Sequence, residues 1–251
     1  MNTVYIDDNH YIKWRNTPWD EKAFQKKTLE ILEIHYENEG MLFDIFNRIN
    51  DIVESEKAEV IYVRYDSSNM AVKRSATKFG YQIVEHSYYV SHPNLKKLAL
   101  KNTKLKIRDF AKEDEGILKS IVKESFLHGR FHEDPFLGAD LAKNRYENWI
   151  PQLIEDTNFH IIEIKGEVAG FFNYVIKDDI LDLPLSGLSK QYSGLGGYMW
   201  NDMFSYIQEK EDVKKVKIMI SAANIAVLNL YTALGFKVTE SLFGYHKHIQ
   251  R

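Results

Sequence analysis

The chain contains no cysteine and only five prolines among its 251 residues. Disulfides, thiolate nucleophiles and cysteine-based zinc sites are therefore excluded. The nine histidines include no HExxH pattern, so we expect no bound metal. No run of about 18 apolar residues occurs, and the first twenty residues lack the apolar segment of a signal peptide. These absences predict a cytoplasmic protein that does not cross a membrane.

An excess of charge of one sign is also lacking. The chain has 33 basic and 36 acidic residues and a net charge of −3. No general positive field exists to collect nucleic acid or an anionic membrane, so an anionic ligand must be held locally. The 44% of hydrophobic residues can form one large core or two smaller ones. The sequence leaves the choice between a monomer and a homodimer open.

Hydrophobic periodicity predicts both helices and strands. The expected helices lie in the segments 29–34, 41–53, from Asn69 onward, 111–126 and 139–154. The expected strands are 60–65, 105–110, 158–164, 168–177 and 180–188, and a helix, strand, helix and strand follow. The basic stretch KKLALKNTK indicates a linker near residue 100. It divides the chain into expected domains 1–100 and 101–251.

The sequence contains an internal repeat. Residues 67–85 (SSNMAVKRSATKFGYQIVE) align without a gap to residues 222–240 (AANIAVLNLYTALGFKVTE). The identical pairs are Asn69 with Asn224, Ala71 with Ala226, Val72 with Val227, Thr77 with Thr232, Gly80 with Gly235 and Glu85 with Glu240. Each copy predicts a strand, an Asn-capped helix, a glycine stop and another strand. We favour duplication over a chance likeness of two common units. Ala76 of the first copy corresponds to Tyr231 of the second.

The segment QYSGLGG, residues 191–197, places three glycines just before an expected helix. A glycine-rich turn running into a helix can point several backbone N–H groups at one anion, aided by the positive end of the helix dipole. Side chains at these glycines would block phosphate oxygens, and some of the positions are candidates for a positive φ angle. The nucleotide patterns GxxxxGK[ST] and GxGxxG both fail here. A plain strand-to-helix connection explains the turn equally well when it is considered alone.

The glycine turn and the second repeat together resemble the GNAT superfamily of acyl-CoA N-acyltransferases. Gln191, Gly194 and Gly196 match the signature Q/R-x-x-G-x-G/A. The next family segment is matched by four residues, with Val227 in place of the usual alanine: Asn224, Tyr231, Gly235 and Phe236. This resemblance implies an α/β GNAT fold, a twisted, mixed and mostly antiparallel sheet flanked by helices. The first half then corresponds to a degenerate GNAT-like copy that lacks the cofactor loop.

The resemblance also implies roles for individual residues. The expected contacts to coenzyme A are Leu188, Gln191, Ser193, Gly194, Leu195, Gly196, Gly197 and Asn224. Tyr231 and Asn224 are the expected catalytic residues. A tyrosine with a pKa of about 10 stays protonated at neutral pH and can give its proton to a departing thiolate. The alternatives are a core tyrosine for Tyr231 and a helix N-cap for Asn224.

The most distinctive segment on the acceptor side is FHEDP, residues 131–135, followed by a helix that carries an aromatic pair. With this helix it resembles bacterial dTDP-fucosamine N-acetyltransferases and related enzymes acting on dTDP-linked amino-deoxysugars. The expected substrate-binding residues are Arg130, His132, Asp134, Tyr146 and Trp149. Arginine and aromatic rings suit a phosphorylated ligand with a flat base. The alternative is a surface segment whose aromatic residues anchor it to the core.

The resemblance therefore implies transfer of an acyl group from acetyl-CoA, or from another acyl-CoA such as hydroxybutyryl-CoA, to a nucleotide sugar. The acceptor is the amine of a dTDP-linked amino-deoxyhexose used for surface polysaccharide such as lipopolysaccharide O-antigen. The sequence distinguishes neither the C3 from the C4 amine nor the general base. Two other functions stay open. One is a GNAT enzyme for a protein N-terminus or an antibiotic, and the other is a non-catalytic acyl-CoA-binding protein.

Overall fold

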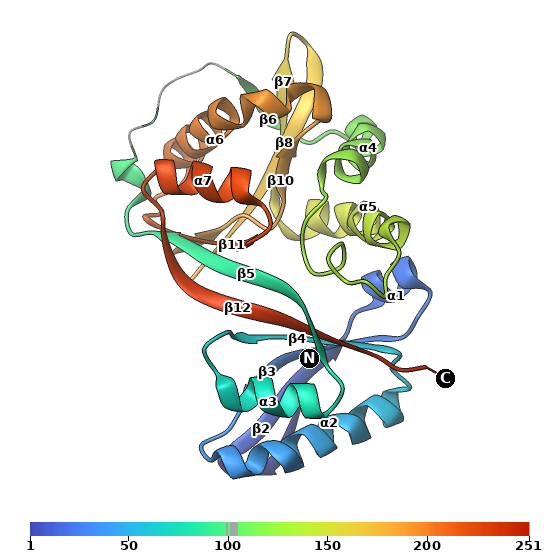
Figure 1. Cartoon of the computed structure of the whole chain (residues 1–251). Coiled ribbons are helices and arrows are strands. Elements are labelled where there is room, and N and C mark those ends of the chain that lie inside the picture. The colour runs from blue at the N-terminus through green and yellow to red at the C-terminus, as the bar shows by residue number, and fades with distance from the viewer. Residues whose placement is uncertain (99, 101–104, 251) are drawn as a thin grey trace. The chain divides into compact units, whose positions relative to one another are not determined.

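The computed structural model describes residues 1–98, 100 and 105–250 (Figure 1). The expected boundary near residue 100 falls beside 99 and 101–104, which lie outside these residues. The chain packs into two compact units, and neither is one continuous stretch. Unit 1 comprises Met1–Ser87, Gly129–Arg145 and the C-terminal segment from Glu240, whereas unit 2 comprises Tyr88–His128 and Tyr146–Thr239. The units thus differ from the expected division at residue 100 in three segments: residues 88–98 belong to unit 2, whereas 129–145 and the segment from Glu240 belong to unit 1.

Unit 1 contains a mixed sheet flanked by helices. Its strands, in spatial order, are β1 (Asn2–Asp7), β2 (His10–Asn16), β3 (Thr28–His35), β4 (Val60–Asp66) and the end of β12 (Lys237–His248). Its helices include α1 (Pro18–Phe24), α2 (Leu42–Glu56) and α3 (Met70–Lys78). β3 and β4 are parallel, whereas β12 runs antiparallel to β4. β5 (Gln82–His92) and β12 both have residues in each unit.

Helix α2 confirms the helix expected over 41–53. Its buried side chains recur at three- and four-residue spacings and pack in the core of unit 1: Leu42, Ile45, Phe46, Ile49, Ile52 and Val53. This spacing forms one apolar face of a helix. The chain enters the helix through a short turn in which Asn38 accepts a hydrogen bond from the Gly40 amide at 2.8 Å. It leaves at Lys57, which has a φ of 55°.

The helix expected over 29–34 is wrong, because these residues form strand β3. Leu29 and Ile31 pair in parallel with Ile61 and Val63 of β4. Parallel strands are covered on both faces, so they lack the simple alternation of a half-exposed strand. Apolar residues on both faces of a short strand then produce a spacing that periodicity cannot distinguish from a helix.

Unit 2 contains a mostly antiparallel sheet. Its strands are β6 (Lys106–Asp109), β7 (Asn158–Ile164), β8 (Glu167–Lys177), β9 (Ile180–Asp182), β10 (Ser186–Leu188) and β11 (Lys215–Ser221). The spatial order is β11-β9-β8-β7-β6, and β10 pairs with β8. The helices that contribute residues to it include α4 (Glu115–Ser125), α5 (Ala139–Asp156), α6 (Gly196–Lys210) and α7 (Ile225–Ala233). α5 begins in unit 1 and continues in unit 2. The single strand expected over 180–188 is instead divided into β9 and β10.

The two copies of the repeat have the same helix caps. The Asn69 side chain accepts a hydrogen bond from the Val72 amide at 2.9 Å, and the Asn224 side chain accepts one from the Val227 amide at 3.3 Å. Both helices stop at a glycine with positive φ, Gly80 at +83° and Gly235 at +86°. The amide after each glycine bonds to the carbonyl five residues earlier, at 2.9 and 3.0 Å. This termination needs the left-handed region, which favours glycine.

Candidate functional site

A break in strand pairing marks the candidate site of unit 2. The parallel strands β9 and β11 pair only at Ile180 with Lys215 and at Leu181 with Val216. Beyond Leu181 the chain leaves β11 and continues as β10, which pairs with β8 (Figure 1). In the described residues, β10 and β11 therefore form no ladder with each other. An extended ligand can hydrogen-bond to backbone groups exposed by such a divergence.

The glycine turn follows β10 directly. The Ser189 amide donates to the Ala169 carbonyl at 2.8 Å, and a 3-10 turn over Lys190–Leu195 leads into α6. No side chain caps the amino end of α6, whose N-cap residue is Leu195. The first N–H groups of a helix need partners from outside it. Their arrangement at the positive end of a 15-residue helix suits an anion.

The three glycines of the turn have open space around them. A Cβ atom added at Gly194, Gly196 or Gly197 would meet no heavy atom within 4 Å. The expectation of a positive φ is wrong, since none of the three is among the residues with positive φ, and Gly196 has a φ of −50°. Neither backbone strain nor packing in the free protein requires glycine here. Any requirement must therefore come from a ligand.

The other predicted cofactor residues occupy the same segment. Leu188 is buried at the end of β10, whereas Gln191 and Ser193 are exposed in the turn. Gln191 Nε2 lies 3.4 Å from a Glu167 carboxylate oxygen, and the Tyr192 hydroxyl donates to that oxygen at 2.9 Å. Leu195 packs partly against the core of unit 2. The turn is thus anchored at its start while its glycines stay open.

Tyr231 lies on α7 and is only 3% exposed. Its ring centroid is 4.9 Å from that of Phe236 and 6.0 Å from that of Trp200. Burial raises the pKa of Tyr231, and the nearby Asp182 charge acts in the same direction. The phenol therefore stays protonated at neutral pH, as a proton donor must. The packing equally fits the alternative of a core tyrosine, so the catalytic role stays a prediction.

Asp182 is a candidate site residue that the sequence did not single out. It ends β9, at the position where pairing with β11 stops. Burial raises the pKa of its carboxyl group, although the Leu183 amide and Lys217 act in the opposite direction. Carboxyl groups with a raised pKa occur often at functional sites, and the charge of Asp182 also acts on Tyr231. Its signal in the sequence was weak, because one acidic residue in an apolar run has no motif.

Unit 1 contains a comparable divergence without the glycine turn. β3 and β4 pair from Thr28 with Val60 as far as Ile31 with Val63. A groove of about 590 Å³ follows, and its lining includes Glu33, Asp66 and Arg64. Arg64 is already paired with Glu85 at 2.9 Å, so the two carboxylates leave the groove unfavourable for a diphosphate. The cofactor is therefore expected in unit 2.

The predicted substrate-binding residues fall into both units. Arg130 and Asp134 are buried in unit 1, where His132 is partly buried. Tyr146 and Trp149 belong to unit 2 and pack against a hydrophobic cluster there that includes Ile150 and Phe171. The Tyr146 hydroxyl donates to the His128 carbonyl at 3.1 Å. A role of these five residues in substrate binding stays a prediction.

Arg130 is held by a buried carboxylate that the sequence did not reveal. Its guanidinium group lies 3.0 Å from Glu30 Oε1 and 4.3 Å from the centre of the Tyr62 ring. Arg15 contacts the other oxygen of Glu30 at 2.6 Å. Burial alone would raise the pKa of Glu30, but the two guanidinium groups outweigh it and lower the pKa to about 2. Arg130 is thus ion-paired inside unit 1 to a carboxylate that it shares with Arg15.

We expect this pair to make unit 1 sensitive to acid. The folded pKa of Glu30 lies below its unfolded value, so its stabilisation is present above about pH 4.5 and is lost as the pH falls toward 2. The loss is about 2–3 kcal/mol. Chemical unfolding of wild type and Glu30→Gln between pH 7 and 2.5 measures it. The free-energy gap between the two proteins should shrink as the pH falls, and a constant gap would contradict the assignment.

Similarity to other proteins supports the fold described above. No family model matches the chain. A spore coat polysaccharide biosynthesis protein, SpsD of Bacillus subtilis (strain 168), is 22% identical over 244 residues, which cover 93% of this chain and 82% of that protein. A GCN5-related N-acetyltransferase from Sphaerobacter thermophilus superposes with a TM-score of 0.69 at 13% identity, covering 97% of this chain and 78% of that one. The chain therefore has the GNAT fold.

A tandem GNAT protein from the clavulanic acid biosynthesis pathway is also similar. It superposes with a TM-score of 0.60 at 8% identity and covers 89% of this chain and 76% of that one. A tandem GNAT arrangement in that protein is consistent with the two matching helix caps of this chain. No helix in the described ranges combines the length and apolar composition of a membrane-spanning segment.

Proposed function

We propose that the chain is an N-acyltransferase that uses an acyl-CoA. The observation that carries the proposal is the divergence of β10 from β11, followed at once by a glycine turn and the uncapped start of α6. The pantetheine arm, which is extended, pairs with the backbone groups of the diverging strands. The diphosphate binds the amides around Gly194–Gly197. The GNAT fold supports this placement.

The chemical step is direct attack on the thioester. The unprotonated amine of the acceptor attacks the carbonyl carbon, and a C–N bond forms as the C–S bond breaks. Backbone N–H groups near Leu188 stabilise the oxyanion. Tyr231 gives its proton to the departing sulfur, and the amine loses its extra proton to water or to a base. Asp182, whose pKa is raised by burial, is a candidate for that base.

We infer that the acceptor is the amine of a dTDP-linked amino-deoxyhexose. The FHEDP segment and the following helix support this class by resemblance, and the similarity to a spore coat polysaccharide biosynthesis protein agrees with a sugar substrate. The acyl donor is acetyl-CoA or a larger acyl-CoA. We also propose that the first half is a degenerate GNAT-like copy, because the caps of α3 and α7 match.

Thiol release measured with acetyl-CoA and a panel of dTDP-amino sugars tests the reaction. Turnover with a dTDP-amino sugar and none with the free amino sugar supports the proposal. Turnover with a peptide or an aminoglycoside alone would favour another amine. Binding of coenzyme A without any thiol release would favour a non-catalytic protein. Failure to bind coenzyme A, with the fold intact, would reject the sugar acyltransferase, the enzyme for another amine and the non-catalytic binding protein alike.

The substitution Gly197→Ala should separate stability from cofactor binding. Alanine fits at this position without contact and is the better helix former, so the free energy of unfolding should stay equal or rise by about 0.5–1 kcal/mol. The added methyl group should obstruct the diphosphate and raise the Kd for coenzyme A roughly 10-fold or more. Calorimetry and chemical unfolding measure the two effects.

The matched control is Gly116→Ala, in the first turn of α4. A Cβ atom there also meets nothing within 4 Å, so this variant should show the stability gain without the loss of coenzyme A affinity. Equal affinities for both variants would place the diphosphate away from the turn.

A further inference from the structure

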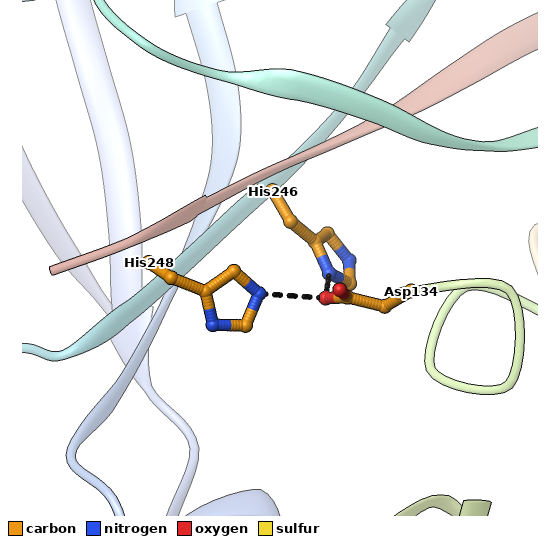
Figure 2. A group of neighbouring side chains, drawn as sticks. All are labelled: Asp134, His246 and His248. Carbon is orange, nitrogen blue, oxygen red and sulfur yellow. Dashed lines mark hydrogen bonds and ion pairs between the residues drawn. The ribbon is translucent and has the colours of Figure 1, made fainter. Parts of the chain in front are cut away.

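Asp134, His246 and His248 of unit 1 bring three ionisable side chains together (Figure 2). His246 Nδ1 lies 2.6 Å from Asp134 Oδ2, and His248 Nε2 lies 2.8 Å from the same oxygen. The three potential ligand atoms are all within 4.8 Å of one another. The sequence predicts only Asp134 as a site residue, in the role of a substrate contact. The two histidines lie more than 110 positions away, and no local pattern connects them to it.

The local structure explains why these side chains meet. His246 and His248 are two residues apart on strand β12, and side chains at this spacing point to the same face of a strand. Pairing of β12 with β4 fixes both positions, His246 opposite Tyr62 and His248 opposite Val60. Asp134 belongs to the loop before α5. The Phe136 amide donates to its Oδ1 at 2.8 Å, which leaves Oδ2 directed at the two rings.

The cluster is enclosed. The side chains of Asp134 and His246 are 0% exposed, and that of His248 is 16% exposed. The rings of Phe131 and Phe136 lie beside the two imidazoles, with centroid distances of 5.6 Å to His246 and 5.3 Å to His248. Two imidazoles that share one carboxylate oxygen in such surroundings form a compact set of two nitrogens and one oxygen.

This donor set fits a transition metal. Zinc binds imidazole nitrogen and carboxylate oxygen at 2.0–2.2 Å, so neighbouring ligands of a tetrahedral ion are roughly 3.3 Å apart. The separations between Asp134 Oδ2 and the two nitrogens, 2.6 and 2.8 Å, are shorter than this value, so the side chains must move apart by roughly 0.5–0.7 Å to admit an ion. Without a metal, each ring directs a proton at the carboxylate. A bound ion takes the place of those two protons.

We propose that Asp134, His246 and His248 bind one divalent first-row transition-metal ion, such as Zn²⁺. Calcium and magnesium are disfavoured, because they prefer six or more oxygen ligands. Three protein ligands leave a coordination position for water. The ion joins strand β12 to the loop that carries Arg130 and His132, so its role is to hold that loop in unit 1. The proposal is independent of the acyltransferase activity.

The positive charge of Arg130 lies close enough to His246 to disfavour a second positive charge at the cluster, and it therefore opposes a bound cation. Glu30, which Arg15 also contacts, offsets part of that charge through its contact with the Arg130 guanidinium at 3.0 Å, and the nearby Glu85 carboxylate acts on Arg130 in the same sense. Asp134 supplies the remaining negative charge directly to the ion. The electrostatic surroundings therefore permit a metal with one bound carboxylate.

Metal titration of the full chain, purified without a histidine tag and treated with EDTA, tests the site. We expect calorimetry to detect one Zn²⁺ per chain. Co²⁺ should give the strong visible absorption of a four- or five-coordinate ion. Asp134→Asn and His248→Ala should each weaken zinc binding roughly 100-fold or more, since each removes one of three ligands. His35→Ala, which removes an exposed histidine elsewhere in unit 1, should leave the affinity unchanged.

Thermal unfolding gives a second readout. Zinc at about 100 times its Kd should raise the wild-type Tm by roughly 5 °C, and the same zinc should not stabilise either ligand variant. Circular dichroism checks that the variants are folded, and His248→Ala is the safer of the two because His248 is partly exposed. Absence of binding to the wild type overturns the proposal. Equal zinc affinity of wild type and folded His248→Ala also overturns it.

Discussion

Tyr231→Phe should lower kcat by roughly 10²- to 10³-fold while the Kd for coenzyme A changes little. The substitution removes only the hydroxyl group, and the phenylalanine ring keeps the contacts with Trp200 and Phe236. Burial holds the phenol protonated, so a proton is available for the sulfur throughout the neutral pH range. Steady-state thiol release and calorimetric binding of coenzyme A together measure the effect.

Tyr174→Phe is the matched control for this prediction. Tyr174 is 2% exposed and belongs to the same hydrophobic cluster as Tyr231, and burial also raises its pKa. Its hydroxyl group, however, donates to Glu211 at 2.8 Å. The control should therefore keep kcat near the wild-type value. If both variants lost activity equally, or if Tyr231→Phe were fully active, Tyr231 would be a packing residue rather than an acid.

Gly170→Ala should destabilise unit 2 by about 3 kcal/mol and displace β10 from β8. A Cβ atom at Gly170 would lie 2.4 Å from the Gly187 carbonyl oxygen and 3.0 Å from the Leu188 Cα atom. Both obstacles are backbone atoms, so no side-chain rotation can relieve the clash. Since β10 carries Leu188, coenzyme A affinity should fall together with stability.

Chemical unfolding and coenzyme A calorimetry measure the two losses for Gly170→Ala. The control is again Gly116→Ala, which adds the same methyl group in the same unit without a contact. A Gly170→Ala protein as stable as the wild type would mean that the backbones of β10 and β8 are not closely packed at Gly170. The pairing of Leu188 with Gly170 would then not position the candidate site.

Much of the fold was predictable because local chemistry dictates it. The caps of α3 and α7 follow from an asparagine and a glycine at fixed offsets, and the strand over 158–164 is confirmed as β7. The GNAT fold, expected from the glycine turn and the second repeat, is confirmed. By contrast, the helix predicted over 29–34 is wrong and the segment forms β3, since burial of both faces of a parallel strand depends on neighbours remote in sequence.

The site was only partly predictable for a related reason. The glycine turn is a continuous motif, so its residues could be named from the sequence. The Glu30 and Arg130 pair and the Asp134 cluster join residues about 100 or more positions apart. The spacing of residues within a short sequence segment cannot predict contacts between residues so far apart. The positive φ expected in the turn is absent because α6 begins in ordinary helical geometry at Gly196, with a φ of −50°.

The pairing of the C-terminal strand β12 with β4 decides whether the first half of the chain can exist alone. β12 continues the second repeat, yet its residues 242–248 pair with β4 along the whole of Val60–Asp66. A fragment that stopped at residue 100 would leave that edge of β4 bare, with seven residues of backbone donors and acceptors ready to recruit other chains. We therefore expect a fragment of residues 1–100 to associate with other chains rather than stay monomeric.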